Sequence, residues 1–568
     1  MTRKRKIEKD RPALPSVYSM VTDDDGERAW PKVIGLYLGD RDEYVEFHKN
    51  GEEQEIIWEF LSFVKDSCSH TTLYANDAVD SDHKFIVNAL VRHGEDLEFP
   101  GGTAKIRWVG PKIDFMDAYQ VMAMGLNKAS RAMQVTRRLS GDNGHDPKLY
   151  SDCIALSETL QTFEDMINSH FPGVSATKSS TLSLTAVKIF DKRYFPMKEI
   201  NPNEEFEEYL RLATYAGRNE VYRRYGETIN MYDIRGNYIS CYDAPMPVGK
   251  LRWTRPNIDH GTLAEAKVSV PYNLFIGPLP CRINGKLVFP TGNIVGWWDM
   301  TDLRGAAELG CDMDILRQLE CDEVPIMKGF GSRVCELRDE AEYGQHNPDL
   351  GRIFKTLGLR LCGKLGQHRV RTEVRKTCSI NNLVGWSPLD EEETYHERTV
   401  KLKGSRMPYV KPGINMRVRA EARKRHLKHL LEAENRGKLF YCDVDSVNTT
   451  ADLEVGMRHG ELQLKDKAMR AYFIKPKVYG YIDQYGKTRQ RTAGFKDLPL
   501  TEVELEGLIR GEEIQCKWKG LTGWKDLMSA DGIRVVERRR TLRDNGMHGR
   551  IILEDKVNTR PVRVEMFS

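Results

Sequence analysis

The sequence lacks the features that would place the protein in a membrane or in an oxidising compartment. Its apolar runs are too short to span a bilayer, and no apolar core of a signal peptide follows the basic N-terminus. The eleven cysteines include no Cys-x-x-Cys pair, which argues against a zinc site or a disulfide framework. We therefore expect a cytoplasmic protein with reduced thiols and no membrane partner.

Bulk charge and repetition are absent as signals as well. The 568 residues carry 86 basic and 83 acidic side chains, so the net charge of +3 does not by itself indicate a nucleic-acid partner. The chain has no internal repeat and no low-complexity segment. Its basic residues do cluster, however, and clusters on one wall would form a groove for a polyanion. They lie at 3–6, 352–376, 417–428 and 538–543.

The chain is long enough for several domains, and its 40% of hydrophobic residues can build large cores. Hydrophobic periodicity predicts an α/β pattern from Val17 onward. The predicted strands are 33–38, 71–75, 231–234, 274–276 and 286–289. The predicted helices are 55–64, 85–92, 149–167, 349–365 and a basic helix at 414–432.

The stretch 441–446 reads Tyr-Cys-Asp-Val-Asp-Ser and predicts a strand, a tight turn and a second strand. Asp443 and Asp445 are two residues apart, which places both carboxylates on one face of a regular strand. Two such carboxylates repel each other, and a divalent metal with a preference for oxygen ligands removes the conflict. The alternative is a solvated hairpin tip with two acidic residues, and the spacing alone does not decide between them.

Several separated motifs settle the matter by their order. Residues 233–240 follow Asp-x-x-Ser-Leu-Tyr-Pro in outline, 355–363 follow Lys-x-x-x-Asn-Ser-x-Tyr-Gly, 441–446 follow Tyr-x-Asp-Thr-Asp-Ser, and 477–479 follow Lys-x-Tyr. Residues 214–217 approximate a Tyr-x-Gly-Gly turn, and Pro-Met-Pro-Val-Gly follows the first motif. Through these motifs the chain resembles the family B DNA polymerases, and among them the protein-primed group of bacteriophages and linear plasmids. The second motif departs most, since Leu359, Arg360 and Cys362 replace Asn, Ser and Tyr.

This resemblance implies an α+β, multidomain fold, with an RNase H-like, exonuclease-type domain followed by a right-hand polymerase of palm, fingers and thumb. The expected divisions follow the motifs along the chain. They are a basic disordered arm at 1–15, the exonuclease-like domain at 16–170, linker and palm with the first motif at 171–250, insertion and palm at 251–340, the fingers helix at 341–369, a second insertion at 370–412, palm with the third motif and Lys-x-Tyr at 413–500, and the thumb at 501–568.

The resemblance also implies the catalytic residues of a DNA-directed DNA polymerase, which joins a dNTP to a primer 3′-hydroxyl by phosphoryl transfer at two metal ions. We expect Asp233 and Asp445 to bridge two Mg²⁺ ions, with Mn²⁺ as an alternative, and Asp443 to assist. Lys355 would contact the incoming triphosphate. The ordinary alternatives are a strand-end turn residue for Asp233 and an exposed helix lysine for Lys355.

The remaining implied sites surround the nucleotide and the primer. Tyr238 matches the tyrosine that excludes a ribose 2′-hydroxyl, and Cys362 leaves space where the family has a tyrosine. Lys477 and Tyr479 would hold the primer end, although Tyr479 could instead be a core residue. Arg218 is expected to contact the template backbone.

The N-terminal region lacks most of the acidic residues that a 3′–5′ exonuclease needs for its own two metals. The family's Asp-x-Glu falls near Ser19-Met20-Val21, with Asp23, Asp24, Asp25 and Glu27 just beyond. Asn76 of the second motif is present without its Asp, and Asp152 of the third has Lys148 in place of Tyr. We predict a retained fold without proofreading; a shifted pair formed by Asp25 and Glu27 is the alternative.

The implied partners are template–primer DNA and dNTPs. The sequence leaves open whether the primer is a nucleic acid or the hydroxyl of a terminal protein, and strand displacement is implied by the resemblance alone. For a phage or plasmid gene the compartment would be the host cytoplasm. A non-enzymatic, polymerase-derived nucleic-acid-binding or scaffold protein is the second hypothesis, favoured by the altered second motif. An exonuclease-only enzyme is the third and has the fewest matching residues.

Overall fold

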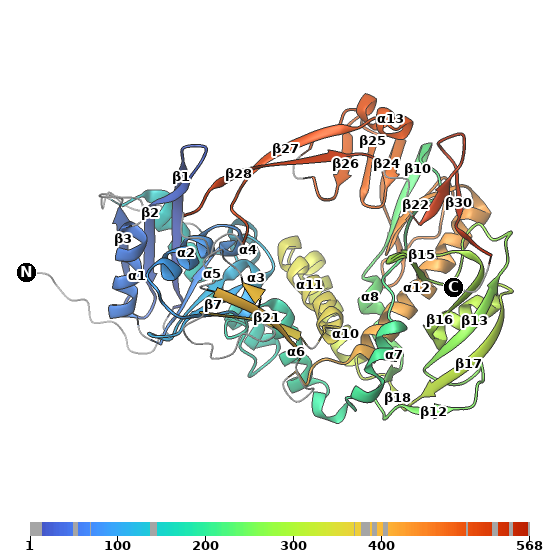
Figure 1. Ribbon diagram of the computed structural model, residues 1–568, viewed down its shortest axis with the longest axis horizontal. Coiled ribbons are helices and arrows are strands. Elements are labelled where there is room, and N and C mark those ends of the chain that lie inside the picture. The colour runs from blue at the N-terminus through green and yellow to red at the C-terminus, as the bar shows by residue number, and fades with distance from the viewer. Residues whose placement is uncertain are drawn as a thin grey trace, which may run out of the picture.

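The computed structural model describes residues 14–48, 55–68, 70–136, 145–368, 370–376, 387–388, 395–401, 407–495, 498–524, 532–544 and 549–565. The chain forms several packed bodies of helices and sheets, with the N-terminal third at one end and the C-terminal half at the other (Figure 1). The fold is therefore α+β and multidomain, as the sequence predicted. No helix in the described ranges is both long and apolar enough to cross a membrane.

The N-terminal body is built on a seven-stranded sheet of order β3-β2-β1-β4-β8-β7-β5. Side chains alternate between its faces: Tyr18 points into a core with the first two helices, whereas its neighbour Val17 points into the core on the other face. The strands are β1 (Ser16–Asp24), β2 (Ala29–Leu38), β3 (Glu43–His48), β4 (Thr72–Ala75), β5 (Leu97–Glu98), β7 (Lys105–Trp108) and β8 (Ile113–Asp117), and β6 (Pro100–Thr103) lies outside the sheet.

Helices cover both faces of this sheet. Helices α1 (Glu55–Ser67) and α2 (Asp82–Arg92) cover one face, and α5 (Pro147–His170) crosses the other. The second face shares its core with helices from the middle of the chain, so the N-terminal body is not an isolated unit. These helices are α3 (Ala118–Met122), α4 (Leu126–Ala132), α6 (Leu182–Arg193), α10 (Lys328–Asp339) and α11 (Pro348–Leu365).

Helix α11 starts where the sequence places a strong helix-start signal. Asn347 accepts a hydrogen bond from the Leu350 N–H at 3.0 Å, and Pro348 occupies the first turn. A buried stripe then runs to Leu365, and Gly366 follows the last turn. A π-helical turn at Glu340–Gly344 precedes α11 and joins it to α10.

The second seven-stranded sheet, called the central sheet below, has the order β26-β25-β24-β10-β23-β22-β9. It brings together strands that lie more than 200 residues apart in the sequence, because β10 sits between β23 and β24. Its members are β9 (Asn219–Val221), β10 (Tyr225–Ile234), β22 (Leu439–Asp443), β23 (Ser446–Thr449), β24 (Leu462–Lys475), β25 (Val478–Asp483) and β26 (Thr488–Thr492).

Helix α12 (Pro412–Arg436) lies between the central sheet and a five-stranded sheet of order β12-β17-β13-β16-β31. Two arginines of its basic cluster are buried: Arg417 pairs with Asp299 at 2.8 Å and Arg423 pairs with Asp302 at 2.5 Å. These cations therefore join helix and sheet instead of facing a polyanion. The five-stranded sheet contains β12 (Arg252–Thr254), β13 (Leu263–Val270), β16 (Thr291–Asp299), β17 (Asp312–Glu320) and β31 (Arg563–Val564), with α9 (Met300–Glu308) following β16.

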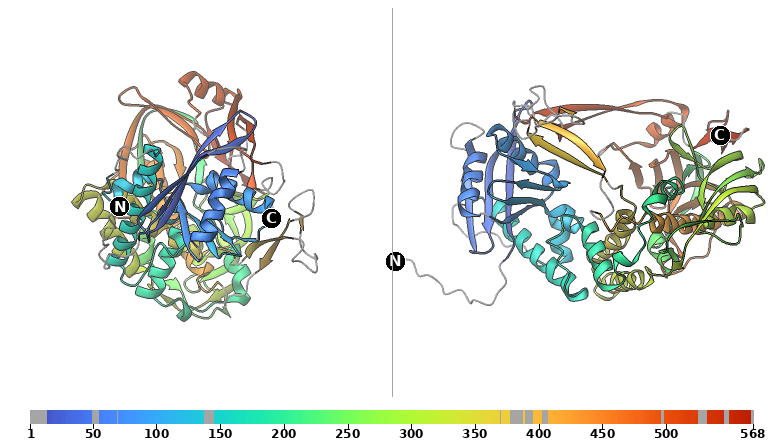
Figure 2. Two further views of the ribbon diagram at one scale, coloured as in Figure 1. Left: turned by 90° about the vertical axis from the view of Figure 1, so that its left-hand side faces the viewer. Right: turned by 60° about the horizontal axis from the view of Figure 1, so that its bottom comes forward.

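Smaller elements complete the chain. The described parts of 370–412 form a three-stranded sheet, β19-β21-β20. A long two-stranded ribbon of β27 and β28 leaves helix α13 and runs toward β1 (Figures 1 and 2). The bounds are α7 (Glu207–Leu212), α8 (Asn237–Ser240), β11 (Met246–Pro247), β14 (Cys281–Ile283), β15 (Lys286–Val288), β18 (Glu323–Val324), β19 (Val370–Lys376), β20 (Ser387–Pro388), β21 (Tyr395–Lys401), α13 (Glu502–Arg510), β27 (Ile514–Leu521), β28 (Val535–Leu542), β29 (Arg550–Ile552) and β30 (Thr559–Pro561).

Most of the predicted elements are confirmed, with their ends extended by a few residues. The predicted strand at 274–276 is wrong: Leu274 donates its N–H to the carbonyl of Pro271 at 3.2 Å in a turn. Proline at 271, 278 and 280 limits ladder hydrogen bonding there and explains why three apolar residues form no strand. The predicted arm at 1–15 lies outside the described residues except for its last two.

Candidate active site

The centre of the candidate site is the turn between β22 and β23. Asp443 pairs with Ser446 across this hairpin, and Ser446 in turn pairs with Asp233 on β10. The Ile234 N–H also donates to the Asp445 carbonyl at 2.7 Å. The structure therefore brings together the two regions that the sequence predicted to meet.

The carboxyl groups of Asp233 and Asp445 influence each other. Burial raises the pKa of Asp445 to about 7, and the neighbouring carboxylate of Asp233 raises it further. Burial also raises the pKa of Asp233, while Lys355 opposes the rise at both residues. The nearby cations do not offset the burial, because both pKa values remain raised. Such a pair is poorly stabilised by the protein alone and would gain from a bound cation.

Asp443 differs from the other two acids because the protein neutralises it. The Lys477 Nζ lies 2.8 and 3.0 Å from its two oxygens, and the Asn219 Nδ2 donates to it at 2.9 Å. Arg491 adds a longer contact at 3.8 Å. Asp443 thus serves as an internal counter-ion, and Lys477 is committed to it. Neither side chain is free for the role that the sequence suggested unless the pair opens.

The residue between the two acids has an unusual backbone. Val444 has a φ of +62°, which is strained for a β-branched residue. Three neighbours hold it there: its N–H donates to the Arg218 carbonyl at 2.7 Å, its carbonyl accepts from Asn237 at 3.2 Å, and its side chain packs over Gly217. The turn that carries Asp445 is therefore fixed by surrounding structure, not by its own preference.

Lys355, Tyr238 and Cys362 line the same region from two helices. Lys355 is half-buried on α11, and it lowers the pKa of both Asp233 and Asp445. Burial raises the pKa of Tyr238, on α8, to about 12, with Cys362 and Asp445 among its charged neighbours. Cys362 is buried, and its sulfur receives a hydrogen bond from the Asn415 Nδ2 at 3.2 Å.

Tyr479 and Arg218 occupy positions that favour structure over exposure. Tyr479 packs against Tyr441, with ring centroids 5.3 Å apart, in the core of the central sheet. Arg218 is 3% exposed; it pairs with Glu220 at 2.6 Å and stacks over Phe289 at 3.6 Å. A buried, fully paired guanidinium does not reach a template backbone, so we do not retain the predicted DNA contact of Arg218.

Sequence reasoning missed two cations at this site. Arg338 of α10 and Lys465 of β24 both lower the pKa of Asp233. Lys465 shares the face of the sheet near Asp233, because Asp233 pairs with Gln463 and the Lys465 Nζ donates to the Gln463 side chain at 2.7 Å. The strand alternation of β24 contained this signal, but the predicted element there began only near Phe473.

The N-terminal body places the residues of its incomplete motifs at different depths. Asp23 and Asp24 end β1 at the surface, and Asp25 is exposed and accepts hydrogen bonds from the N–H groups of Glu27 and Arg28. Asn76 uses its side-chain oxygen on the Leu126 N–H at 2.9 Å. The shifted pair of Asp25 and Glu27 is thus a turn on the surface.

Two buried acids of the N-terminal body were not identified from the sequence. Burial raises the pKa of Asp82 to about 7 and that of Asp117 to about 6, and both carboxyl groups raise the pKa of Tyr18. Asp117 is fully buried and caps α3 through the Tyr119 N–H at 2.8 Å. Asp82 was overlooked because four residues separate it from the motif position at 86.

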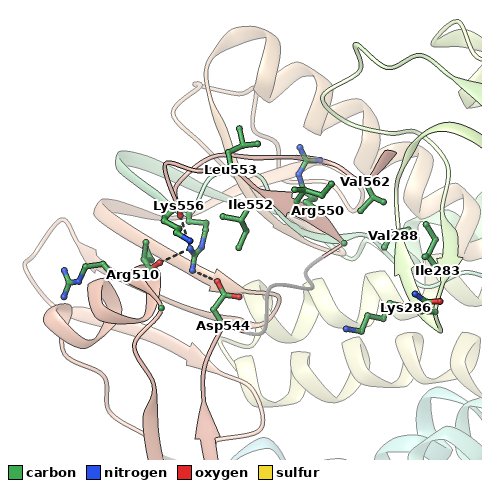
Figure 3. A pocket seen from close by; sticks show the side chains of 16 residues that line it. Ile283, Lys286, Val288, Arg510, Asp544, Arg550, Ile552, Leu553, Lys556 and Val562 are labelled. Carbon is green, nitrogen blue, oxygen red and sulfur yellow. Dashed lines mark hydrogen bonds and ion pairs between the residues drawn. The ribbon is translucent and has the colours of Figure 1, made fainter. Parts of the chain in front are cut away.

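A cavity of about 610 Å³ lies away from these acids, on the other side of the palm-like sheet (Figure 3). The β14–β15 hairpin, the end of α13 and the β29–β30 hairpin form its walls, and Arg224 and Asp544 pair at its edge at 2.6 Å. None of the predicted site residues lines it. The cavity therefore does not mark the candidate chemistry.

Comparisons with known proteins agree with this arrangement. Residues 149–375 match the family described as DNA polymerase type B, organellar and viral. A probable DNA polymerase of Podospora anserina is 25% identical over 375 residues, covering 58% of this chain and 31% of that protein. A probable DNA polymerase of Neurospora intermedia is 23% identical over 407 residues, covering 65% of this chain and 41% of that protein. The chain thus spans less than half the length of both relatives.

Solved structures show the same fold over nearly the whole chain. Phi29 DNA polymerase complexed with primer-template DNA and incoming nucleotides has a TM-score of 0.69 at 14% identity, covering 94% of this chain and all of that one. The orthorhombic crystal form of the same polymerase has a TM-score of 0.66 at 14% identity and equal coverage. The predicted right-hand fold is confirmed, and the match over residues 149–375 places the chain among the type B DNA polymerases of the organellar and viral kind.

Proposed function

We propose that the protein is a DNA-directed DNA polymerase that adds dNTPs to a primer hydroxyl. The observation that carries the proposal is the adjacency of Asp233 and Asp445, two half-buried carboxyl groups with raised pKa values that face Lys355. Conserving such a pair inside a sheet is costly without a cation to neutralise it. The fold and the family match support the same activity.

The donor set suits Mg²⁺ with Asp233 and Asp445 as the protein ligands. Within the described ranges no group of three or more His, Cys, Asp or Glu side chains is placed to hold a metal, so the protein contributes a pair of carboxylates. Mg²⁺ is commonly held by one or two carboxylates together with substrate phosphates and water. When bound, two such ions would neutralise charge on the transferring phosphoryl group. Mn²⁺ has the same ligand preference.

The protein side chains would position the nucleotide around that pair. Lys355 and the two additional cations, Arg338 and Lys465, supply positive charge for a triphosphate, and positioning with charge compensation is most of what phosphoryl transfer requires. Tyr238 would lie under the sugar and exclude a 2′-hydroxyl. Cys362, smaller than the tyrosine of the family motif, would leave the base-pair pocket wider at its wall.

The Lys-x-Tyr residues would act on the primer side in an altered way. The Lys477 ammonium holds Asp443, and Tyr479 supports the sheet beneath it. We propose that this pair keeps the primer end aligned by fixing the acidic turn, with a direct contact to the primer only when Lys477 releases Asp443. Nucleic-acid and terminal-protein primers both remain compatible with this arrangement.

We also propose that the N-terminal body does not proofread. The position of the family's first acidic motif holds Ser19, Met20 and Val21, and the acids beyond it lie at the surface. Asp82 and Asp117 are buried with raised pKa values, which favours protonated carboxyl groups over metal ligands. A 3′-trimming assay on single-stranded DNA tests this: metal-dependent trimming that is lost in Asp25→Ala or Asp82→Ala would contradict it.

Primer extension with Mg²⁺ and dNTPs tests the polymerase proposal. Wild type should extend an annealed primer, and Asp233→Asn and Asp445→Asn should each lower the rate by about 10³-fold or more, corresponding to ~4 kcal/mol of transition-state stabilisation. Asp452→Asn, an acid at the far end of the same hairpin, is the matched control and should extend like wild type. Template binding without extension by the folded wild type would favour the scaffold hypothesis instead.

A further inference from the structure

The ribbon of β27 and β28 has little support between its two ends. It is a sheet of only two strands, and residues 536–540 of β28 are exposed on both faces of the ribbon. A two-stranded sheet is marginally stable by itself in water. The course of the ribbon from α13 toward β1 therefore depends on what holds each end (Figures 1 and 2).

The far end of the ribbon is joined to the N-terminal body by backbone pairing. Arg28 and Arg534 form an antiparallel bridge, flanked by two hydrogen bonds. The Ala29 N–H donates to the Ile533 carbonyl at 2.9 Å, and the Val535 N–H donates to the Glu27 carbonyl at 2.8 Å. The end of the ribbon thus extends the strands that flank the β1–β2 turn.

Apolar packing strengthens this junction. Ile533 is 4% exposed and belongs to the core that also contains Tyr18 and Phe60 of the N-terminal body. Leu521, Trp524 and Val535 pack against the same core from the ribbon. Burying one such side chain contributes as much as several surface contacts, so this end is a built junction and not a chance touch.

The N-terminal body has a second, separate junction with the rest of the chain. Its helices share a core with α10 and α11, Arg131 pairs with Asp349 at 3.0 Å, and the Asn347 Nδ2 donates to the Ala132 carbonyl at 2.9 Å. The contacts therefore form a closed circuit: N-terminal body, α11, central sheet, α13, ribbon and N-terminal body again.

The ribbon carries an excess of positive charge along this circuit. Lys517, Lys519, Arg538, Arg539 and Arg540 are exposed or half-exposed on it, whereas Glu537 is the acid among its described strand residues. Exposed cations spaced along a strand suit the phosphate backbone of a nucleic acid and carry no sequence preference.

We propose that the N-terminal body acts as a clasp for the thumb ribbon, and that DNA is held inside the circuit that the clasp closes. This gives the body a mechanical function that does not require 3′ trimming. The inference rests on the proposed polymerase function, since the DNA enclosed is the primer–template. Without a free end to thread, DNA enters only when the junction at Ile533 opens.

A disulfide across the junction tests the clasp. Arg28 and Arg534 occupy a bridge position whose flanking hydrogen bonds leave it non-hydrogen-bonded, where Cα atoms lie about 4.5 Å apart, within disulfide range. Both side chains are exposed, so Arg28→Cys with Arg534→Cys leaves the core intact. Gln515→Cys with Thr541→Cys is the matched control, because these residues pair within the ribbon and do not tie it to the N-terminal body.

The experiment compares a primed circular single strand with a primed linear one of equal length. Protein oxidised before mixing should extend the linear template and lose at least 90% of extension on the circle, and reductant should restore it. Protein oxidised after loading on the circle should extend it and resist a heparin trap better than reduced protein. The control pair should extend both templates in either redox state.

Other outcomes would overturn the clasp while leaving the polymerase proposal separate. Equal extension of the circle by protein oxidised before mixing means that no closed circuit needs to open. Loss of extension on both templates, restored by reductant, means that the junction must move during catalysis and is not a fixed clasp. Failure of the reduced protein on both templates would instead contradict the polymerase proposal itself.

A second variant probes the same junction without cysteines. Ile533→Ser should shorten the product made per binding event at least threefold under a heparin trap, while single-nucleotide insertion stays within twofold of wild type. Val536→Ser, an exposed position on the ribbon, is its control and should change neither quantity. Unchanged product length in Ile533→Ser would overturn the clasp.

Discussion

Ile234 donates its N–H to the carbonyl of Asp445 at 2.7 Å, which ties the end of β10 to the acidic turn between β22 and β23. The bond places Asp233, the preceding residue, beside the turn whatever the length of chain between them. The same turn is supported from below by Gly217 and Arg218. Its geometry therefore depends on three distant segments, and changes in any of them should affect Asp445.

Gly217→Ala should impair extension more than stability. A Cβ at this position would lie 2.8 Å from the Val444 Cγ1, and Val444 cannot turn away easily because its backbone is already held at a positive φ. We expect the turn to shift and the extension rate to fall by about 10-fold or more, since small misplacements at a reacting centre are costly. Gly305→Ala, where an added Cβ meets open space, should leave the rate unchanged. A normal rate in Gly217→Ala would show that the turn tolerates displacement.

Lys477 and Asp443 should behave as a coupled pair in a double-mutant cycle. Lys477→Gln leaves Asp443 without its ammonium partner, and Asp443→Asn leaves Lys477 without its carboxylate. Because Lys477 is about half exposed, solvent screens the pair, and we expect a coupling energy of ~1 kcal/mol in the free energy of unfolding. Asp443→Asn should also retain measurable extension, unlike Asp445→Asn. Strictly additive effects would show that the pair contributes nothing to stability.

The sequence predicted the hairpin, the meeting of residue 233 with the acidic turn, and helix α11, because each depends on local signals such as alternation, a cap or a motif. It did not separate Asp443 from Asp445, since nothing local indicates that Lys477 reaches back to the first acid. Arg218 was misjudged for a related reason: its partners Glu220 and Phe289 come together only in the folded chain. Burial and charge pairing across distant segments are the information that a single sequence carries least clearly.

Tyr238→Val should relax sugar selection. If the Tyr238 ring lies under the sugar of a bound nucleotide, shortening the side chain removes the clash with a 2′-hydroxyl, and the ratio of dNTP to rNTP incorporation should fall about 100-fold, equivalent to ~3 kcal/mol. Tyr238→Phe keeps the ring and is the matched variant; it should preserve the ratio. Gel separation of single-nucleotide products on one template measures both. An unchanged ratio in Tyr238→Val would move the sugar pocket elsewhere.

Asp82 should make the N-terminal body less stable as pH rises from 4 to 7. Burial raises its folded-state pKa to about 7, above the value near 3.9 of an unfolded chain, so between these values the folded state holds a proton that the unfolded state has released. Stability conferred by that proton is fully present below the unfolded pKa and is lost as pH rises through the folded one.

Asp82→Asn removes this proton exchange and should therefore stabilise the protein at pH 8 but not at pH 4. The expected gain at pH 8 is on the order of 2 kcal/mol, below the ceiling that the full pKa shift would set. Thermal melts at the two pH values measure it, with the exposed Asp80→Asn as the control that should show no difference. Asp117 shifts in the same direction, to about 6, so some pH dependence should persist in Asp82→Asn. A variant that melts below wild type at pH 8 would mean that the Asp82 carboxylate, held in its ionised form, is what the N-terminal body requires, as a metal-binding site there would demand.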